Sequence, residues 1–150
     1  MRVVGFPWPG SCLTDAWSTN TSTTTVSLRA RANGRYVTAD QGGAAPLTAS
    51  RSWVSTWELF DRLNLGNGYI ALRSHANGRY VTADRAGAGP LYANRTAIGT
   101  WERFRLVSNA HGSVALLAAA NGRYVTDNAG ASPLIANRTA VAAWEEFDIS

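Results

Sequence analysis

The sequence predicts an all-β fold, a β-trefoil of twelve strands in three repeats of about 44 residues with pseudo-threefold symmetry. The segment Ala32–Asp40 recurs unchanged 44 residues later, and its first seven residues recur after a further 44. The third copy is one residue shorter, and we place its gap before Asp127. Each repeat has four short strand-like stretches, and no window shows the sustained 3.6-residue period of a helix. A propeller has four or more blades and a solenoid has capping repeats, so three copies favour the trefoil.

The second repeat illustrates the first two predicted strands. Ile70 and Leu72 alternate with other side chains, which is the period of a half-buried strand. Asn77-Gly78 follows, and this dipeptide predicts a tight hairpin because both residue types tolerate a positive φ. Arg79–Thr82 is then predicted as a second strand because it is rich in β-branched and aromatic residues.

A glycine, alanine and proline stretch precedes the last two predicted strands. It ends at Pro90 and turns the chain into a third strand that begins at Leu91. The fourth strand carries Phe104, and Leu106 follows two residues later on the same face. In the first repeat, Arg62 stands where Leu106 stands in the second. The pattern of apolar residues is therefore broken once.

The repeats define one predicted domain with a segment before it. Their expected bounds are 26–69, 70–113 and 114–150. Residues 1–25 lie outside them, and Asn20–Thr25 has the composition of a Ser/Thr linker. This segment is either the end of a preceding domain with its linker or a tail that packs on the trefoil. In the second case Phe6, Trp8 and Trp17 would be its anchors.

Composition argues against catalysis and against several ligand classes. Cys12 is the single cysteine, so neither an internal disulfide nor a multi-cysteine zinc site is expected. All 14 basic residues are arginines, which excludes lysine chemistry, and no hydrolase, metalloprotease or phosphate-binding motif is present. We therefore expect no enzyme activity, cofactor or metal. The net charge is +4, but acids are interleaved with the arginines and no basic stripe for nucleic acid is visible. No 18-residue apolar run exists, so no membrane partner is expected.

Tryptophan and glutamate stand side by side once in each repeat, just before the fourth-strand phenylalanine. The pairs are Trp57-Glu58, Trp101-Glu102 and Trp144-Glu145. An indole offers a flat apolar face, and a carboxylate accepts hydrogen bonds from paired hydroxyl groups. A sugar ring has one apolar face and a rim of hydroxyls, so the pairs predict three equivalent carbohydrate sites.

Hydrogen-bond donors precede each pair by a few residues. The predicted donors are Asn94, Arg95, Asn137, Arg138 and, in the first repeat, Arg51. The first repeat has Ser50 in place of asparagine and Trp53 in place of alanine, so we expect its site to be altered or weaker.

A structural role for the glutamates is the alternative. Glu58 and Phe60 share parity on a strand, as do their equivalents. If the phenylalanine points into the core, the glutamate points inward as well and holds backbone N–H groups of a loop. The tryptophan, of opposite parity, would then face solvent unless the strand begins after it.

The repeated motifs resemble a known family. Asn-Gly-Arg-Tyr-Val-Thr-Ala-Asp, followed by Ala-Asn-Arg-Thr-Ala-Ile-Gly-Thr-Trp-Glu-Arg-Phe, resembles the fascin-like trefoil repeats, and most closely the bacterial modules of carbohydrate-binding module family 92. The resemblance covers residues 26–150. It implies up to three equivalent sites for β-1,3- and β-1,6-glucan, each built on the Trp and Glu of the pairs above.

The resemblance implies a non-catalytic, lectin-like and multivalent module. We expect a monomer that is secreted beside an appended glycoside hydrolase domain, and the absence of lysine suggests a bacterium of high GC content. The alternative is a fascin-like module that binds actin or another protein.

Overall fold

Seven strand segments form a closed antiparallel barrel, with two strands from each repeat. They are β1 (Thr23–Val26), β2 (Leu28–Ala30), β5 (Phe60–Gly66), β6 (Tyr69–Ser74), β9 (Phe104–Ser108), β10 (Val114–Ala118) and β13 (Phe147–Ile149). The structure is a computed structural model that describes residues 23–128 and 132–150. The hydrogen-bonded order is β1-β5-β6-β9-β10-β13-β2. Since β1 and β2 are two halves of one strand separated at Ser27, this order closes on itself.

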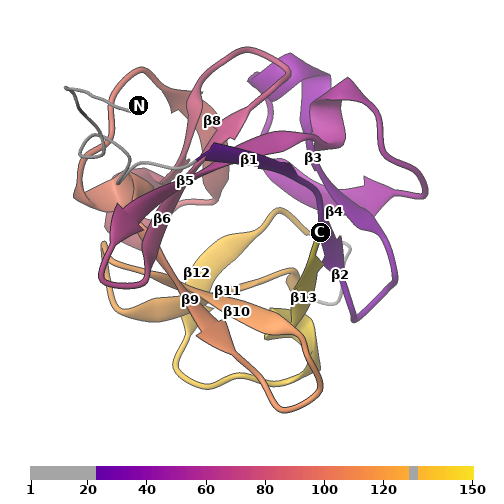
Figure 1. Ribbon diagram of the computed structural model, residues 1–150, viewed down its shortest axis with the longest axis vertical. Coiled ribbons are helices and arrows are strands. Elements are labelled where there is room, and N and C mark those ends of the chain that lie inside the picture. The colour runs from indigo at the N-terminus through magenta and orange to yellow at the C-terminus, as the bar shows by residue number, and fades with distance from the viewer. Residues whose placement is uncertain (1–22, 129–131) are drawn as a thin grey trace, which may run out of the picture.

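The other six strands form one hairpin in each repeat. The hairpins are β3 (Tyr36–Ala39) with β4 (Leu47–Arg51), β7 (Tyr80–Ala83) with β8 (Leu91–Arg95), and β11 (Arg123–Thr126) with β12 (Ile135–Arg138). Figure 1 shows the three repeats as lobes around a common centre, from indigo through magenta to yellow. This arrangement is the predicted β-trefoil. It has thirteen strands instead of twelve because the first strand is split at Ser27.

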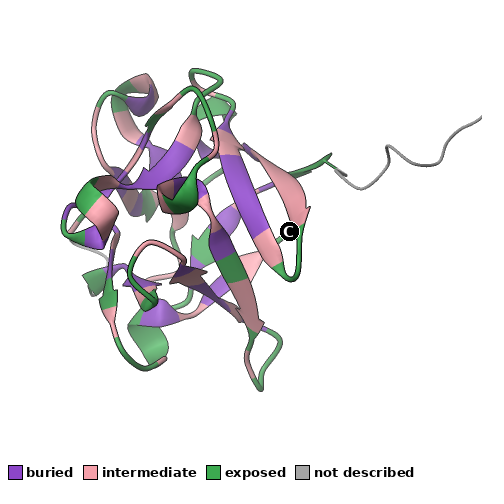
Figure 2. Ribbon diagram, turned by 90° about the vertical axis from the view of Figure 1, so that its left-hand side faces the viewer, coloured by how far each residue is buried: buried purple, intermediate pink, exposed green. Residues whose placement is uncertain are grey.

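Apolar side chains at equivalent positions of the three repeats build the core. They include Phe60, Phe104, Phe147, Leu28, Leu72, Leu116, Leu47, Leu91, Leu134, Val37, Val81 and Val125. Core residues on the barrel strands lie two positions apart, as Ile70 and Leu72 on β6 illustrate, and Figure 2 shows buried strand segments inside and exposed loops at the edge. The period-two pattern in the sequence therefore gives one shared core. Among the described residues, no helix has the length and apolar character needed to cross a membrane.

Hydrogen bonds between Ser27 and Ser150 complete the barrel. The Ser27 N–H donates to the Ser150 carbonyl at 2.8 Å, and the Ser150 N–H donates back at 3.1 Å. β1 begins at Thr23 and pairs with β5, so Thr23 to Thr25 belong to the trefoil and not to the segment before it. Their β-branched side chains suit an edge of the barrel. Residues 1–22, including the proposed anchors Phe6, Trp8 and Trp17, lie outside the described residues.

The Asn-Gly loops differ from the tight hairpin that the sequence predicts. Gly78 has a positive φ of 71°, whereas Asn77 is not among the residues with positive φ. The Asn77 side chain instead donates from Nδ2 to the Ala93 carbonyl at 2.8 Å and accepts from the Arg79 N–H at 3.0 Å. The other two repeats have the same pair of bonds. The asparagine therefore ties the first loop of each repeat to its third strand.

The missing residue of the third repeat lies after Asn128 and not before Asp127. β11 aligns with β3 and β7, so the residue after Thr126 takes the place of Ala39 and Ala83. Asp127 is fully buried, as those alanines are. Asn128 is consequently the equivalent of Asp40 and Asp84.

Asp61 on β5 joins three segments of the first two repeats. Its carboxylate accepts hydrogen bonds from Thr25 on β1 at 3.3 Å and from Arg73 on β6 at 2.9 Å, and it contacts His75 Nε2 at 2.8 Å. Burial alone would raise the pKa of Asp61, but the bonds to His75 and Arg73 outweigh it and lower that pKa. His75 thus has a structural partner, and Arg31, at the same position of the first repeat, bonds in the same way to Asp148 at 2.8 Å.

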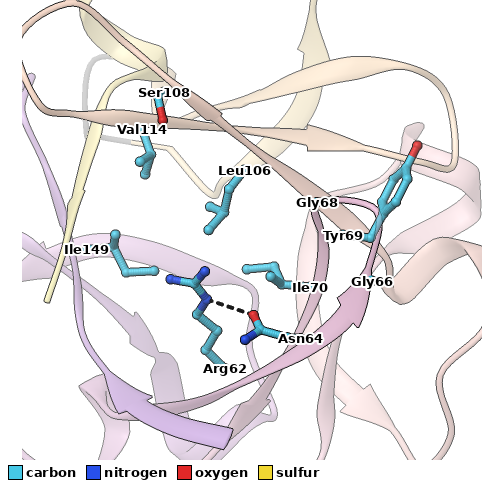
Figure 3. Close-up of a pocket in the computed structure, with 10 residues that line it drawn as sticks. All are labelled: Arg62, Asn64, Gly66, Gly68, Tyr69, Ile70, Leu106, Ser108, Val114 and Ile149. Atoms are coloured by element: carbon cyan, nitrogen blue, oxygen red, sulfur yellow. Dashed lines mark hydrogen bonds between the residues drawn. The ribbon is translucent and has the colours of Figure 1, made fainter. Parts of the chain in front are cut away.

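A cavity of about 430 Å³ opens at the end of the barrel where the β5–β6 and β9–β10 hairpins turn. Figure 3 shows the Arg62 side chain extending toward it beside Ile70, Leu106 and Ile149. Arg62 Nε donates to Asn64 Oδ1 at 3.3 Å. The arginine therefore occupies the place that Leu106 and Ile149 fill in the other repeats.

Arg62→Leu should raise the melting temperature. Leucine would bury more apolar surface in the cavity and would remove a partly desolvated cation, a gain of about 1 kcal/mol. For a chain of this size that gain corresponds to about 2–4 °C in thermal unfolding. Arg79→Leu, at an exposed position, is the control and should change little. A lower melting temperature for Arg62→Leu would mean that the bond to Asn64 outweighs packing.

Candidate functional site

The Trp-Glu pairs lie in short 3-10 turns that precede the last strand of each repeat. The turns are η3 (Thr56–Glu58), η5 (Thr100–Glu102) and η7 (Ala143–Glu145). The strand begins after the turn, at the phenylalanine. The parity of side chains along a strand therefore does not decide where the tryptophan and the glutamate point.

The three glutamates are buried and hold the turn. Glu58, Glu102 and Glu145 are 2%, 5% and 3% exposed. Oε1 of each accepts a hydrogen bond from the backbone N–H three residues earlier, at 2.9, 2.7 and 2.8 Å respectively. In the second repeat the Thr82 hydroxyl also donates to Glu102 Oε2 at 2.6 Å. These contacts match the structural role considered above and fix the backbone on which the tryptophan is mounted.

The three tryptophans stay partly open to solvent. Trp57 and Trp144 are 36% and 38% exposed, and Trp101 is half-buried. An arginine guanidinium lies over each ring. The distance from the guanidinium carbon to the ring centroid is 5.5 Å for Arg51, 5.2 Å for Arg95 and 5.2 Å for Arg138. Cation–π attraction orients both groups, so each repeat presents a partly open indole beside guanidinium N–H donors.

A second residue braces each arginine. Nη2 donates to Oδ1 of Asp40, Asp84 or Asn128 at 3.0, 3.1 and 3.2 Å. We name the clusters the first site (Asp40, Arg51, Trp57, Glu58), the second site (Asp84, Arg95, Trp101, Glu102) and the third site (Asn128, Arg138, Trp144, Glu145). The bracing residues were missed in the sequence, although Asp40 and Asp84 close the repeated segment and offered a signal.

The predicted asparagines, Asn94 and Asn137, each accept a hydrogen bond from the arginine that follows them. Arg95 Nε donates to Asn94 Oδ1 at 3.2 Å, and Arg138 Nε donates to Asn137 Oδ1 at 3.3 Å. The first site lacks this contact, because Ser50 shares a hydrogen bond with Thr48 instead. Its guanidinium is therefore less constrained than the other two.

The second site borders a shallow cavity of about 360 Å³. It is lined by Arg95, Gly99, Thr100, Trp101 and Glu102. This volume is at the lower end of the range for small-ligand sites, about 300–1,000 Å³. The lining combines an apolar ring with charge-bearing donors and an acceptor, which suits a small ligand with one apolar face and a polar rim.

The first site has an additional exposed aromatic residue. Trp53 is 72% exposed, and Val54 beside it is 37% exposed. The other repeats have alanine at the position of Trp53. The first repeat thus has an exposed apolar surface that the other two lack, and a weaker first site stays a prediction.

The repeats also match a known protein family. The family model described as the Fascin domain matches residues 35–149. The chain belongs to the fascin domain family. All three sites of this fascin domain fall within the matched residues. No curated protein matches the chain.

Solved structures share the fold of this fascin domain at low sequence identity. A designed threefold symmetric protein, ThreeFoil, is 18% identical with a TM-score of 0.75 over 83% of this chain and 96% of its own. An endo-β-galactosidase from Clostridium perfringens is 9% identical, with a TM-score of 0.71 over 83% of this chain and 32% of the enzyme. An exo-β-1,3-galactanase from Clostridium thermocellum is 13% identical, with a TM-score of 0.71 over 84% and 30% respectively. The chain therefore spans about a third of each enzyme.

Proposed function

We propose that this fascin domain is a non-catalytic carbohydrate-binding module that binds β-glucan, with β-1,3 and β-1,6 linkages, at up to three sites. The observation that carries the proposal is the threefold recurrence of a partly open indole beside a braced guanidinium. Folding alone does not require an exposed tryptophan at three equivalent positions. The resemblance of the motifs to carbohydrate-binding module family 92 supports the same function, as does the occurrence of this fold in two glycan-cleaving enzymes.

In this mechanism each side chain has a distinct task. A pyranose ring stacks on the indole, and the guanidinium N–H groups donate to its hydroxyl oxygens. The aspartate or asparagine that braces the arginine accepts from a hydroxyl group at the rim. The buried glutamate holds the turn that carries the tryptophan, and in the second site its edge lines the cavity. Each glutamate is thus a positioning residue, and in the second site only the part of Glu102 that lines the cavity faces the sugar.

Three shallow sites would act together on a polymer. Each site contacts a small area, so its own affinity is modest. Once one site is bound, the others meet neighbouring chains at a high effective concentration, and retention on an insoluble polysaccharide exceeds single-site affinity. Such retention suits a monomeric module, secreted by a bacterium, that keeps an appended glycoside hydrolase on its substrate.

A pull-down on insoluble polysaccharides tests this function. Retention is expected on curdlan (β-1,3-glucan) and pustulan (β-1,6-glucan), with less on cellulose and chitin, and soluble glucan oligosaccharide should release the protein. Arg123→Ala, which removes an exposed arginine outside the three sites, should be retained like the parent. Failure to bind any polysaccharide, together with salt-sensitive pelleting with actin filaments, would instead favour the protein-binding alternative.

A further inference from the structure

The third site differs from the first in the group that bonds to its arginine, which is a neutral amide in place of a carboxylate. We propose that it binds a carboxylate-bearing sugar, such as a β-linked glucuronic acid residue, in preference to a neutral one. The proposal rests on the carbohydrate-binding function above and gives one of its sites a substrate class of its own.

The three arginines are held in nearly the same geometry. The bracing bonds from Nη2 measure 3.0, 3.1 and 3.2 Å, and the guanidinium-to-indole distances lie between 5.2 and 5.5 Å. The third bracing group is the amide of Asn128, whereas the first two are carboxylates. The substitution therefore changes charge while preserving the position of the guanidinium.

Arg138 consequently has no carboxylate partner within residues 23–128 and 132–150. Arg51 and Arg95 form ion pairs with Asp40 and Asp84, and no ion pair of Arg138 occurs in that part of the chain. The three residues between Asn128 and Ser132 are Ala, Gly and Ala, which carry no charge. The buried glutamate is common to all three sites and does not distinguish them. Asp127, which stands where the other repeats have alanine, adds a carboxylate to the third repeat, but its side chain is fully buried and, unlike that of Asp40, does not face a ligand at the guanidinium.

The guanidinium of Arg138 can accept an anion. Its hydrogen bonds use Nε, toward Asn137, and Nη2, toward Asn128, while Nη1 takes part in none between described residues. A guanidinium binds a carboxylate through parallel N–H groups, and such charge-assisted bonds are stronger than bonds to a neutral hydroxyl. In the first site the carboxylate of Asp40 would repel the same ligand. A sugar stacked on Trp144 with its carboxylate toward Arg138 would meet no such repulsion.

The first site is the better internal reference for the test. In the second site Arg85 Nε lies 3.9 Å from Asp84 Oδ2, so an additional exposed cation enters the local charge balance. In the first site Asp40 forms an ion pair with Arg51 alone among the described residues. Asp40→Asn therefore removes the carboxylate that faces the guanidinium of the first site, and Asn128→Asp introduces one beside Arg138 in the third.

Single-site proteins test the proposal by titration calorimetry. Trp57→Ala with Trp101→Ala leaves the third site, and Trp101→Ala with Trp144→Ala leaves the first. Each is titrated with a neutral β-gluco-oligosaccharide and with the same oligosaccharide ending in glucuronic acid. The third-site protein should bind the acidic sugar about three- to five-fold more tightly at low salt, the size expected for a partly exposed charge contact. This preference should shrink as ionic strength rises.

Reciprocal variants complete the test. Asn128→Asp should abolish the preference of the third-site protein, and Asp40→Asn should create one in the first-site protein. Acetate at equal ionic strength should compete weakly, since it lacks the sugar ring. Equal affinity for both sugars in the third-site protein would overturn the charge proposal and leave the carbohydrate function standing. Absence of binding to either sugar in every protein would overturn both.

Discussion

Trp101→Ala should remove the second site while leaving the trefoil folded. The indole is half-buried in a surface turn and lies outside the core cluster. Loss of its stacking surface corresponds to about 1.5–3 kcal/mol, or roughly ten- to a hundred-fold in affinity at that site. On a polymer the loss should be graded, because two sites remain, and the combined variant of Trp57, Trp101 and Trp144 should lose retention. Pull-down and thermal unfolding of the same samples measure both properties.

The matched control for the half-buried Trp101 is Trp53, an exposed tryptophan outside the second site. In a protein with Trp57→Ala and Trp144→Ala, only the second site remains, and adding Trp53→Ala should leave binding unchanged. Adding Trp101→Ala to the same protein should abolish it. If Trp101→Ala unfolds the chain, the ring is needed for the stability of the core. Tryptophan then recurs in the three repeats because the fold requires it and not because it binds sugar.

Glu102→Ala should lower the free energy of unfolding by about 2–4 kcal/mol. The substitution removes the acceptor for the Gly99 N–H and the Thr82 hydroxyl, and leaves the buried Thr82 hydroxyl without this partner. Urea denaturation measures this loss of unfolding free energy, and the slope of that free energy against urea concentration should stay unchanged. Binding should weaken only through disorder of the turn that carries Trp101.

Glu102→Gln separates the structural role from direct sugar contact. Glutamine keeps an acceptor at the position of Oε1, so more than half of the stability should return, and binding should recover with it. A Glu102→Gln protein of parental stability that no longer binds would show that the carboxylate itself touches the ligand. That result would contradict the positioning role.

The β-trefoil could be predicted because its signals are local and repeated three times. Alternating apolar residues define each strand, and the core positions recur at equal spacing, as the buried Phe60, Phe104 and Phe147 illustrate. The Asn-Gly loops were predicted as turns, but their geometry was not. The Asn77 amide bonds to Ala93, which lies two strands away along the chain, and no local pattern encodes that contact.

The sites were predictable in part. The recurrence of tryptophan beside glutamate identified the turn that carries both residues, but side-chain parity could not assign the glutamates. Their role depends on a hydrogen bond to the backbone three residues earlier, which exists only because the segment forms a 3-10 turn. The bracing residues were not predicted, because Asp84 and Arg95 are separated in the sequence and come into contact only when the hairpin of β7 and β8 forms. In the third repeat, the sequence alignment placed Asp127 opposite Asp84. The role of Asn128 as the bracing residue was therefore not predicted.

The Ser27–Ser150 pairing has a consequence for how the chain reaches its native state. It joins the first strand to the last, so the barrel contains contacts of the greatest sequence separation in the domain. Contacts of this kind slow folding, because the entropy of bringing distant segments together is lost before any packing is gained. On the ribosome, β2 of the first repeat therefore has one side unpaired until β13 is synthesised.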